Sequence, residues 1–175
     1  MIFKEQKLKG VFVIEPEKKE DNRGFFARTY CSEEFQKRGL VDCAVQCNLS
    51  YSKKAGTLRG MHYQAPPFAE AKLIRCTYGA IFDVMIDLRP ESLTYKKWLG
   101  IKVNAANRQL LYVPEGFAHG FQTLTDHTEV FYQVSRPFTP EAERGIRWND
   151  PAFGIQWPLA VSVISGKDQV HPLFV

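Results

Sequence analysis

The sequence has few of the features that mark specialised classes of protein. It contains only four cysteines (Cys31, Cys43, Cys47 and Cys76), and none of them forms a C-x-x-C pair. No apolar run approaches the roughly 18 residues that a membrane-spanning helix needs. Residues 1–20 carry charges throughout, without the apolar core and small-residue cleavage site of a signal peptide. We therefore expect a cytoplasmic protein with no membrane partner, whose thiols are free and buried or half-buried.

The excess of positive over negative charge is also small. The 23 basic and 19 acidic residues leave a formal net charge of +4. Nucleic-acid-binding proteins usually carry a denser stripe of lysine and arginine, so we expect no nucleic-acid partner. A modest positive excess can still attract a small anionic substrate through a few placed cations. With 45% hydrophobic residues, the 175-residue chain has the composition and length of one globular domain, predicted at residues 1–175.

Strand patterns dominate the chain. Residues 45–51 and 81–88 alternate apolar and polar side chains, which is the pattern of half-buried strands. Further strand-like runs lie at 72–77, 98–103, 109–113, 117–124 and 130–134. A helix is predicted at 32–38, with Ser32 as its cap and Gly39 at its end, and a short helix or turn at 139–143. Many short strands with polar turns predict an antiparallel sandwich or barrel, whose sheet edges favour closure or dimer formation.

Histidine is scarce, and two of the four histidines lie in glycine-containing segments with apolar neighbours. His62 lies in the segment LRGMHYQ, and His119 lies in the segment PEGFAHGF. Taken alone, each is more readily interpreted as a hydrogen-bonded structural residue. Together with the cations Arg59 and Lys72, they form a candidate polar site.

The segment 114–119 has the spacing P-x-G-x-x-H and resembles the second motif of the cupin jelly-roll superfamily. Metal-binding cupins usually also carry H-x-H in their first motif, where this chain has His62, Tyr63 and Gln64, followed by Lys72. One imidazole is missing and a cation lies nearby, whereas a divalent metal needs several neutral or anionic ligands. We expect no metal, and an all-β, cupin-like antiparallel jelly-roll barrel with a few short helices.

Seven segments extend this resemblance to one family. In chain order they are residues 21–26, 46–50, 58–64, 72–76, 82–84, 114–121 and 148–150. Their order and spacing, from about Asp21 to Asp168, resemble those of the dTDP-4-dehydrorhamnose 3,5-epimerases. The resemblance implies a homodimeric isomerase of dTDP-rhamnose biosynthesis that needs no cofactor. Its substrate would be a nucleotide-diphosphate sugar, a 4-keto-6-deoxyhexose in which the carbons beside the keto group are inverted.

Such a reaction needs a base for an alpha proton, a group that stabilises the enolate, and an acid on the opposite face. The resemblance implies His62 as the base, Asp168 as its carboxylate partner, Lys72 near the oxyanion and Tyr132 as the proton donor. Neutral imidazole suits a base near physiological pH, and a neighbouring carboxylate favours the imidazolium that forms. The resemblance also implies that His119 lies near the sugar, with Asp83 as the residue that orients it.

The resemblance further implies a set of substrate-binding residues. Arg23, Asn48 and Arg59 correspond to groups around the sugar and diphosphate, and Phe138 to an aromatic ring against the base. The other contact positions are Gln46, Cys47, Glu143 and Lys167.

One position departs from the family pattern. Typical members have F-F-x-E after the Arg-Gly pair, and this chain has Arg28 in place of the glutamate. A guanidinium reverses the local charge and offers only hydrogen-bond donors. Arg28 is therefore predicted to contact the base or its ribose in a different way.

Three other functions remain as alternatives to the 3,5-epimerase. A single-carbon epimerase would act on carbon 3 or carbon 5 of a differently linked sugar nucleotide. A non-catalytic cupin would bind a sugar nucleotide or serve as an assembly partner, without a need for the acid–base set. A metal-dependent oxygenase is the weakest candidate, because the chain lacks the H-x-H motif.

Overall fold

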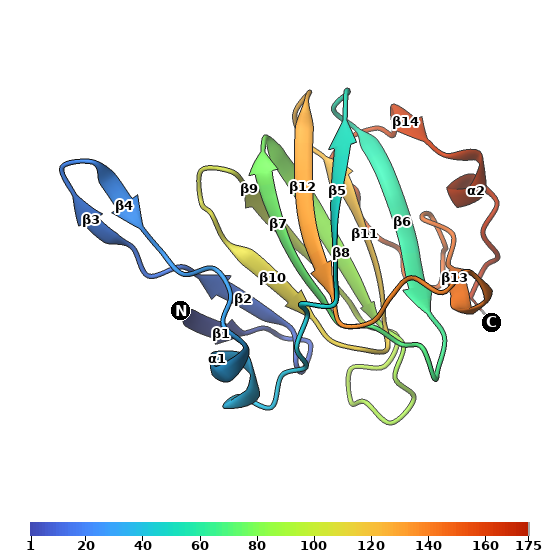
Figure 1. Ribbon diagram of the computed structural model, residues 1–175. Helices are drawn as coiled ribbons and strands as arrows, with labels where there is room; N and C mark the ends of the chain where they lie inside the picture. The colour runs from blue at the N-terminus through green and yellow to red at the C-terminus, as the bar shows by residue number, and fades with distance from the viewer. Residues whose placement is uncertain (175) are drawn as a thin grey trace.

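The computed structural model describes residues 1–174, and two antiparallel sheets form the body of the molecule (Figure 1). The predicted domain extends to Val175, which lies outside the described residues. The first sheet has the order β1 (Ile2–Glu5), β2 (Phe12–Glu15), β10 (Leu110–Val113), β7 (Lys72–Tyr78), β12 (Thr128–Val134) and β5 (Gln46–Ser52). The second has the order β13 (Glu143–Gly145), β6 (Thr57–Gln64), β11 (Phe117–Thr123), β8 (Ala80–Asp87) and β9 (Trp98–Asn104). Strand β14 (Val163–Ile164) pairs with β6 in parallel.

The main hydrophobic core lies between the two sheets. Ile74 and Leu111 of the first sheet meet Met85 and Phe121 of the second in one buried cluster. This two-layer arrangement confirms the predicted antiparallel β class, and the predicted strands match observed ones to within two residues at each end.

Strand β8 is more deeply buried than the alternation of its residues predicts. Asp83 and Asp87 are fully buried on the face that looks into the core, so they do not form a solvated polar face. Val84 and Ile86 point the other way and are covered by Phe153 of the segment that follows β13. A central strand covered on both faces has no exposed side, which is why the prediction of a half-buried strand was wrong here.

The helices are few and short, as predicted. Helix α1 (Ser32–Gln36) has Cys31 at its N-cap without a side-chain hydrogen bond, so the predicted capping by Ser32 was wrong. Gly39 has a φ of +68°, the left-handed conformation expected after a helix end. A 3-10 turn (Pro140–Ala142) lies in the predicted segment 139–143, and α2 (Gly166–Gln169) follows β14. Among residues 1–174, no helix is long and apolar enough to cross a membrane.

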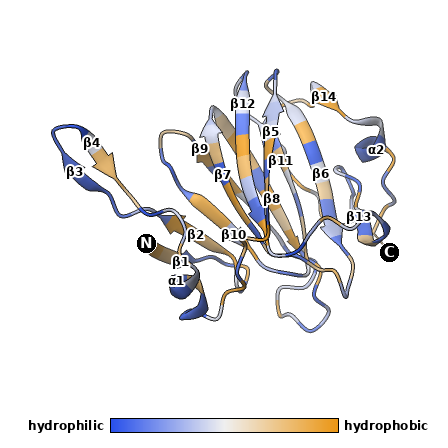
Figure 2. Ribbon diagram, viewed as in Figure 1, coloured by the Kyte–Doolittle hydropathy of each residue, from blue (hydrophilic) through white to orange (hydrophobic). Residues whose placement is uncertain are grey.

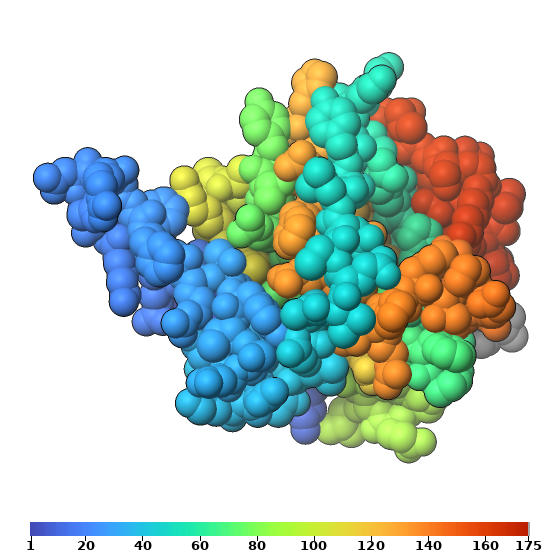
Figure 3. All heavy atoms as spheres, viewed as in Figure 1, coloured from blue at the N-terminus to red at the C-terminus, as the bar shows by residue number. Residues whose placement is uncertain are grey.

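A two-stranded hairpin of β3 (Lys19–Asp21) and β4 (Gly24–Phe26) projects away from the body as an arm (Figures 1 and 3). Its first strand is hydrophilic and its second is hydrophobic (Figure 2). Phe26 on this arm is 71% exposed. The adjacent Phe25 is 41% exposed, and because exposed apolar surface marks interaction sites, the arm is a candidate contact surface.

The four cysteines are free, as predicted. Cys43 and Cys76 are buried and Cys31 is half-buried, but Cys47 is exposed. The prediction for Cys47 was wrong because β5 is an edge strand whose alternate side chains, Cys47 and Leu49 among them, point outward.

Candidate active site

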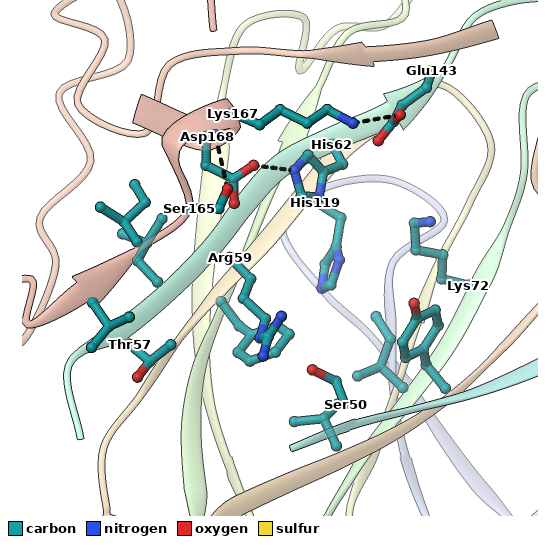
Figure 4. Close-up of a pocket in the computed structure, with 17 residues that line it drawn as sticks. Ser50, Thr57, Arg59, His62, Lys72, His119, Glu143, Ser165, Lys167 and Asp168 are labelled. Atoms are coloured by element: carbon teal, nitrogen blue, oxygen red, sulfur yellow. Dashed lines mark hydrogen bonds and ion pairs between the residues drawn. The ribbon is translucent and has the colours of Figure 1, made fainter. Parts of the chain in front are cut away.

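A cavity of about 470 Å³ opens between the two sheets, and both sheets contribute to its walls (Figure 4). Strands β6 and β11 supply one wall, and strands β5, β7 and β12 supply the other. The segment that carries β14 and α2 lies along the edge of β6, because β14 pairs in parallel with that strand. The pairing brings α2 to the cavity, although more than a hundred residues of chain separate it from His62.

His62 and Asp168 form a close pair at this edge. Nε2 of His62 lies 2.7 Å from Oδ1 of Asp168, and the second carboxylate oxygen accepts a hydrogen bond from the backbone N–H of Gly60 at 3.2 Å. Burial alone raises the pKa of Asp168, but the hydrogen bond and charge of His62, with the Gly60 N–H, hold that pKa below its ordinary value. Asp168 is therefore an ionised partner for the imidazole at neutral pH.

His119 is held beside His62 on the neighbouring strand. The two histidines are directly opposite each other in the register of β6 and β11, and both line the cavity. Nε2 of His119 lies 3.0 Å and 2.9 Å from the two carboxylate oxygens of Asp83. Because Asp83 is fully buried, the pair fixes the orientation of the His119 ring, as the resemblance implied.

Lys72 and Tyr132 line the cavity from the opposite sheet. Figure 4 shows Lys72 across the cavity from Asp168. The ammonium of Lys72 forms an ion pair with Glu70, and both side chains are mostly buried. Burial raises the pKa of Tyr132, and the charge of Glu70 adds to this effect while Arg59 opposes it. The phenol of Tyr132 is therefore protonated at neutral pH and can donate a proton.

Arg59, Glu143 and Lys167 also line the cavity. Nη2 of Arg59 donates to the backbone oxygen of Tyr51 at 3.0 Å, which leaves other donors of the guanidinium free for a ligand. Nζ of Lys167 lies 2.5 Å from Oε2 of Glu143. These groups place two cations beside the His62–Asp168 pair.

A second hollow of about 270 Å³ shares His62, Lys72, Tyr132 and Glu143 with the cavity and so continues it. It is lined by three of the predicted binding residues, Gln46, Asn48 and Phe138. Nε2 of Gln46 donates to Oδ1 of Asn48 at 3.0 Å, and Oε1 of Gln46 accepts from the backbone N–H of Phe138 at 3.2 Å. Phe138 keeps an exposed ring face at the edge of the hollow.

The structure does not bring three of the predicted residues into the cavity of the same chain. Arg23 lies at the turn of the arm, where it pairs with Asp21, and Arg28 pairs with Glu34 at 3.1 Å. Cys47 points outward from β5. Arg23 is remote because the arm projects away from the body (Figure 1), and Arg28 is held away from the cavity by its ion pair with Glu34 of α1.

Sequence reasoning missed two residues of the site. Glu70 precedes the predicted cation Lys72 by two positions, and this E-x-K spacing was the available signal. His171 follows Asp168 by three positions in the last turn of the chain, and its Nε2 lies 3.5 Å from Oδ1 of Asp168. Burial lowers the pKa of His171, with a further contribution from the charge of His62, so this second imidazole is neutral at neutral pH.

Comparisons with known proteins agree with this geometry. The sequence pattern of the dTDP-4-dehydrorhamnose 3,5-epimerase family matches residues 5–175. The dTDP-4-dehydrorhamnose 3,5-epimerase of Sinorhizobium fredii is 43% identical over 98% of this chain and 89% of its own. A dTDP-4-dehydrorhamnose 3-epimerase of Streptomyces niveus is 36% identical over 93% of this chain and 78% of its own.

A solved structure extends the likeness to three dimensions. The crystal structure of the dTDP-4-dehydrorhamnose 3,5-epimerase of Bacillus anthracis, with TDP and PPi bound, superimposes with a TM-score of 0.94. The two proteins are 41% identical, and the match covers 99% of each chain. This agreement confirms the predicted cupin-type fold. The chain is therefore an isomerase that belongs to the dTDP-4-dehydrorhamnose 3,5-epimerase family.

Proposed function

We propose that this protein converts dTDP-4-dehydro-6-deoxyglucose into dTDP-4-dehydrorhamnose by inverting carbons 3 and 5, without a cofactor. The observation that carries the proposal is the arrangement of acid–base groups on two sides of one cavity. His62 and Asp168 come from the β6 side, and Lys72 and Tyr132 come from the opposite sheet. Inversion requires that a proton leave one face of the sugar and arrive at the other, and this arrangement supplies a base and an acid for the two faces.

In the first step His62 removes the alpha proton. Asp168 holds a proton on Nε2 of His62, so that Nδ1 is the unprotonated nitrogen of the neutral ring and takes the proton from carbon. The C–H electron pair forms the C=C bond of an enolate, and the negative charge moves onto the oxygen of the 4-keto group of the sugar. The carboxylate then stabilises the imidazolium, and the ammonium of Lys72 stabilises the enolate oxygen, more strongly in a cavity that excludes water.

In the second step Tyr132 protonates the same carbon from the opposite face. The C=O bond re-forms and the carbon is inverted. The imidazolium of His62 then releases its proton to solvent, and the phenolate of Tyr132 regains one from solvent. Glu70 keeps the Lys72 ammonium in place through their ion pair. The same pair of steps at the second alpha carbon completes the double inversion.

We propose that the nucleotide binds beside the cations of the cavity and in the adjoining hollow. Arg59 and Lys167 supply positive charge for the diphosphate, and the fork of an arginine suits phosphate oxygens. Phe138 offers an exposed ring face in the adjoining hollow for the base, next to Asn48. The structure of the Bacillus anthracis relative, which holds TDP, supports a thymidine nucleotide.

We further propose that the protein is a homodimer and lies in the cytoplasm. Strand β5 is an open sheet edge, and its outward side chains Leu49 and Tyr51 are 63% and 48% exposed. A second copy would cover this edge and the aromatic arm, as sheet edges of this kind require. In such a dimer, the arm of one copy would carry Arg23 toward the cavity of the other.

The experiment that tests the activity is proton NMR of the substrate incubated with the protein in deuterated water. The proposal predicts deuterium at carbons 3 and 5 and the appearance of the rhamno-configured product. Deuterium at one carbon alone would support a single-carbon epimerase, the activity named for the Streptomyces niveus relative. Binding of the nucleotide sugar without any exchange would contradict both and support a non-catalytic protein.

A further inference from the structure

Three side chains with metal-binding atoms meet at the edge of the cavity. Nε2 of His62, Oδ1 of Asp168 and Nε2 of His171 all lie within 4.8 Å of one another. Oδ1 of Asp168 is the centre of the group, 2.7 Å from the first imidazole and 3.5 Å from the second. Two imidazole nitrogens and one carboxylate oxygen are a ligand set that zinc accepts readily, with water in the fourth position.

His171 has no role in the proposed epimerisation, and its environment is unusual. Its ring is 8% exposed, and its Nε2 has no hydrogen-bond partner within residues 1–174. Buried imidazole nitrogens normally find a partner, so an unpartnered one beside a carboxylate is available to bind a ligand. Oδ1 of the neighbouring Asp168 lies 3.5 Å away and forms no hydrogen bond with it.

The backbone of strand β13 fixes the position of the His171 ring on one side. A Cβ atom added to Gly145 would lie 2.2 Å from Cε1 of the ring, so the ring packs directly on strand β13. The backbone oxygen of His171 accepts a hydrogen bond from Nε of Arg147 at 2.9 Å. The imidazole is therefore held in place before any ion arrives, which reduces the entropic cost of binding one.

The two distances to Asp168 suit an ion of the size of zinc. Ligand atoms in a tetrahedral site lie about 3.3 Å apart when the metal bonds are about 2.0–2.1 Å long. The 3.5 Å separation of His171 from Asp168 is already close to this value, and the 2.7 Å pair needs to widen by a few tenths of an ångström. The Gly60 N–H binds the other oxygen of Asp168, an outer contact of the kind that orients metal-binding carboxylates.

We propose that His62, Asp168 and His171 form a binding site for a divalent transition-metal ion, with Zn²⁺ as the preferred ion, and that the bound ion reversibly blocks the enzyme. The site differs from the cupin metal motif, because its second imidazole comes from the C-terminal turn. Zinc would bind Nε2 of His62 in place of the proton that this nitrogen shares with Asp168, and the neutral ring would then carry its proton on Nδ1. The blocking effect rests on the proposed function, since Nδ1 is the nitrogen that removes the substrate proton and would no longer be free to accept it.

Calorimetric titration of ZnCl₂ into the full chain tests the site without substrate. We expect one Zn²⁺ per chain and at least a tenfold loss of affinity in His171→Gln, which keeps the volume but removes the nitrogen ligand. The matched control is His127→Gln, because His127 is exposed and bonded to Tyr51. A Cys47→Ser variant excludes the exposed thiol as the zinc ligand. Unchanged affinity in His171→Gln, or loss in either control, would overturn the site.

Anomalous scattering at the zinc edge from a zinc-soaked crystal locates the ion directly, even if His171→Gln does not fold. The expected peak lies among the three side chains, and a peak only elsewhere overturns the proposal. In deuterated water, saturating zinc should suppress substrate exchange, and a chelator should restore it. Exchange that continues at saturating zinc refutes the blocking effect. A wild-type protein that binds zinc at this cluster, yet exchanges no substrate proton after the chelator has removed the metal, would refute the proposed function and leave the site standing.

Discussion

The carboxylate of Asp87, at the end of the buried strand β8, sets a pH dependence of stability that can be calculated. It is fully buried and accepts five hydrogen bonds, from the backbone and guanidinium of Arg89 and the hydroxyls of Ser92 and Thr94. Burial raises the pKa of this carboxyl, but the hydrogen bonds outweigh burial and lower the pKa from 3.8 to about 2. At about 1.4 kcal/mol per pKa unit, the ionised form stabilises the fold by about 2 kcal/mol.

The sign of this effect follows from the lowered pKa. Because the unfolded chain binds the proton more tightly, the contribution is fully present above about pH 5 and is lost as the pH falls through 3.8 toward 2. An Asp87→Asn variant lacks the titrating group. Its side-chain amide N–H would also face the N–H and O–H donors that bind the carboxylate in the wild type. We expect it to be about 3 kcal/mol less stable than the wild type at pH 7.

The assay is urea unfolding of both proteins at pH 7 and at pH 3. The difference in their free energies of unfolding should shrink by about 1 kcal/mol at the lower pH, because the wild type has by then lost about half of the Asp87 contribution. Other carboxylates titrate equally in both proteins and cancel in the comparison. A difference that stays constant between the two pH values would refute the argument.

Three further predictions concern the cavity and the arm. Asp168→Asn should lower kcat by about 10²-fold or more with little change in KM, because the carboxylate stabilises a charge that forms only during proton removal; an equal rise in KM would assign it to binding instead. Tyr132→Phe should still exchange the substrate's alpha proton with solvent deuterium but form product at least about 10²-fold more slowly, and NMR that finds exchange and inversion lost together would contradict separate faces. Phe26→Asp should shift the sedimenting mass from dimer to monomer, since the exposed ring lies on the arm; an unchanged mass would remove the arm from the proposed interface.

The strands and the two histidines of the cavity could be predicted from the sequence because their signals are local. Alternation marked β5, and motifs with fixed spacing marked His62 and His119, which the structure places opposite each other. The burial of Asp83 could not be predicted in this way, because its face of β8 packs in the core between the two sheets, while a distant segment covers the apolar face that the alternation predicts to be the buried one.

The missed residues share the same cause. His171 becomes part of the site only because β14 pairs with β6 and carries the C-terminal turn to the cavity. Arg23 lies on the projecting arm and Arg28 follows it beside α1, and the direction in which these side chains point depends on tertiary structure that no short motif contains.

The central claim is that His62 removes the alpha proton, and deuterium exchange by His62→Asn tests it most directly. The variant and a matched His127→Asn control are incubated with dTDP-4-dehydro-6-deoxyglucose in deuterated water, and deuterium at carbons 3 and 5 is followed by NMR. The account predicts that exchange falls by at least about 10²-fold in His62→Asn and keeps the wild-type rate in the control. Exchange at the wild-type rate in His62→Asn would contradict the account.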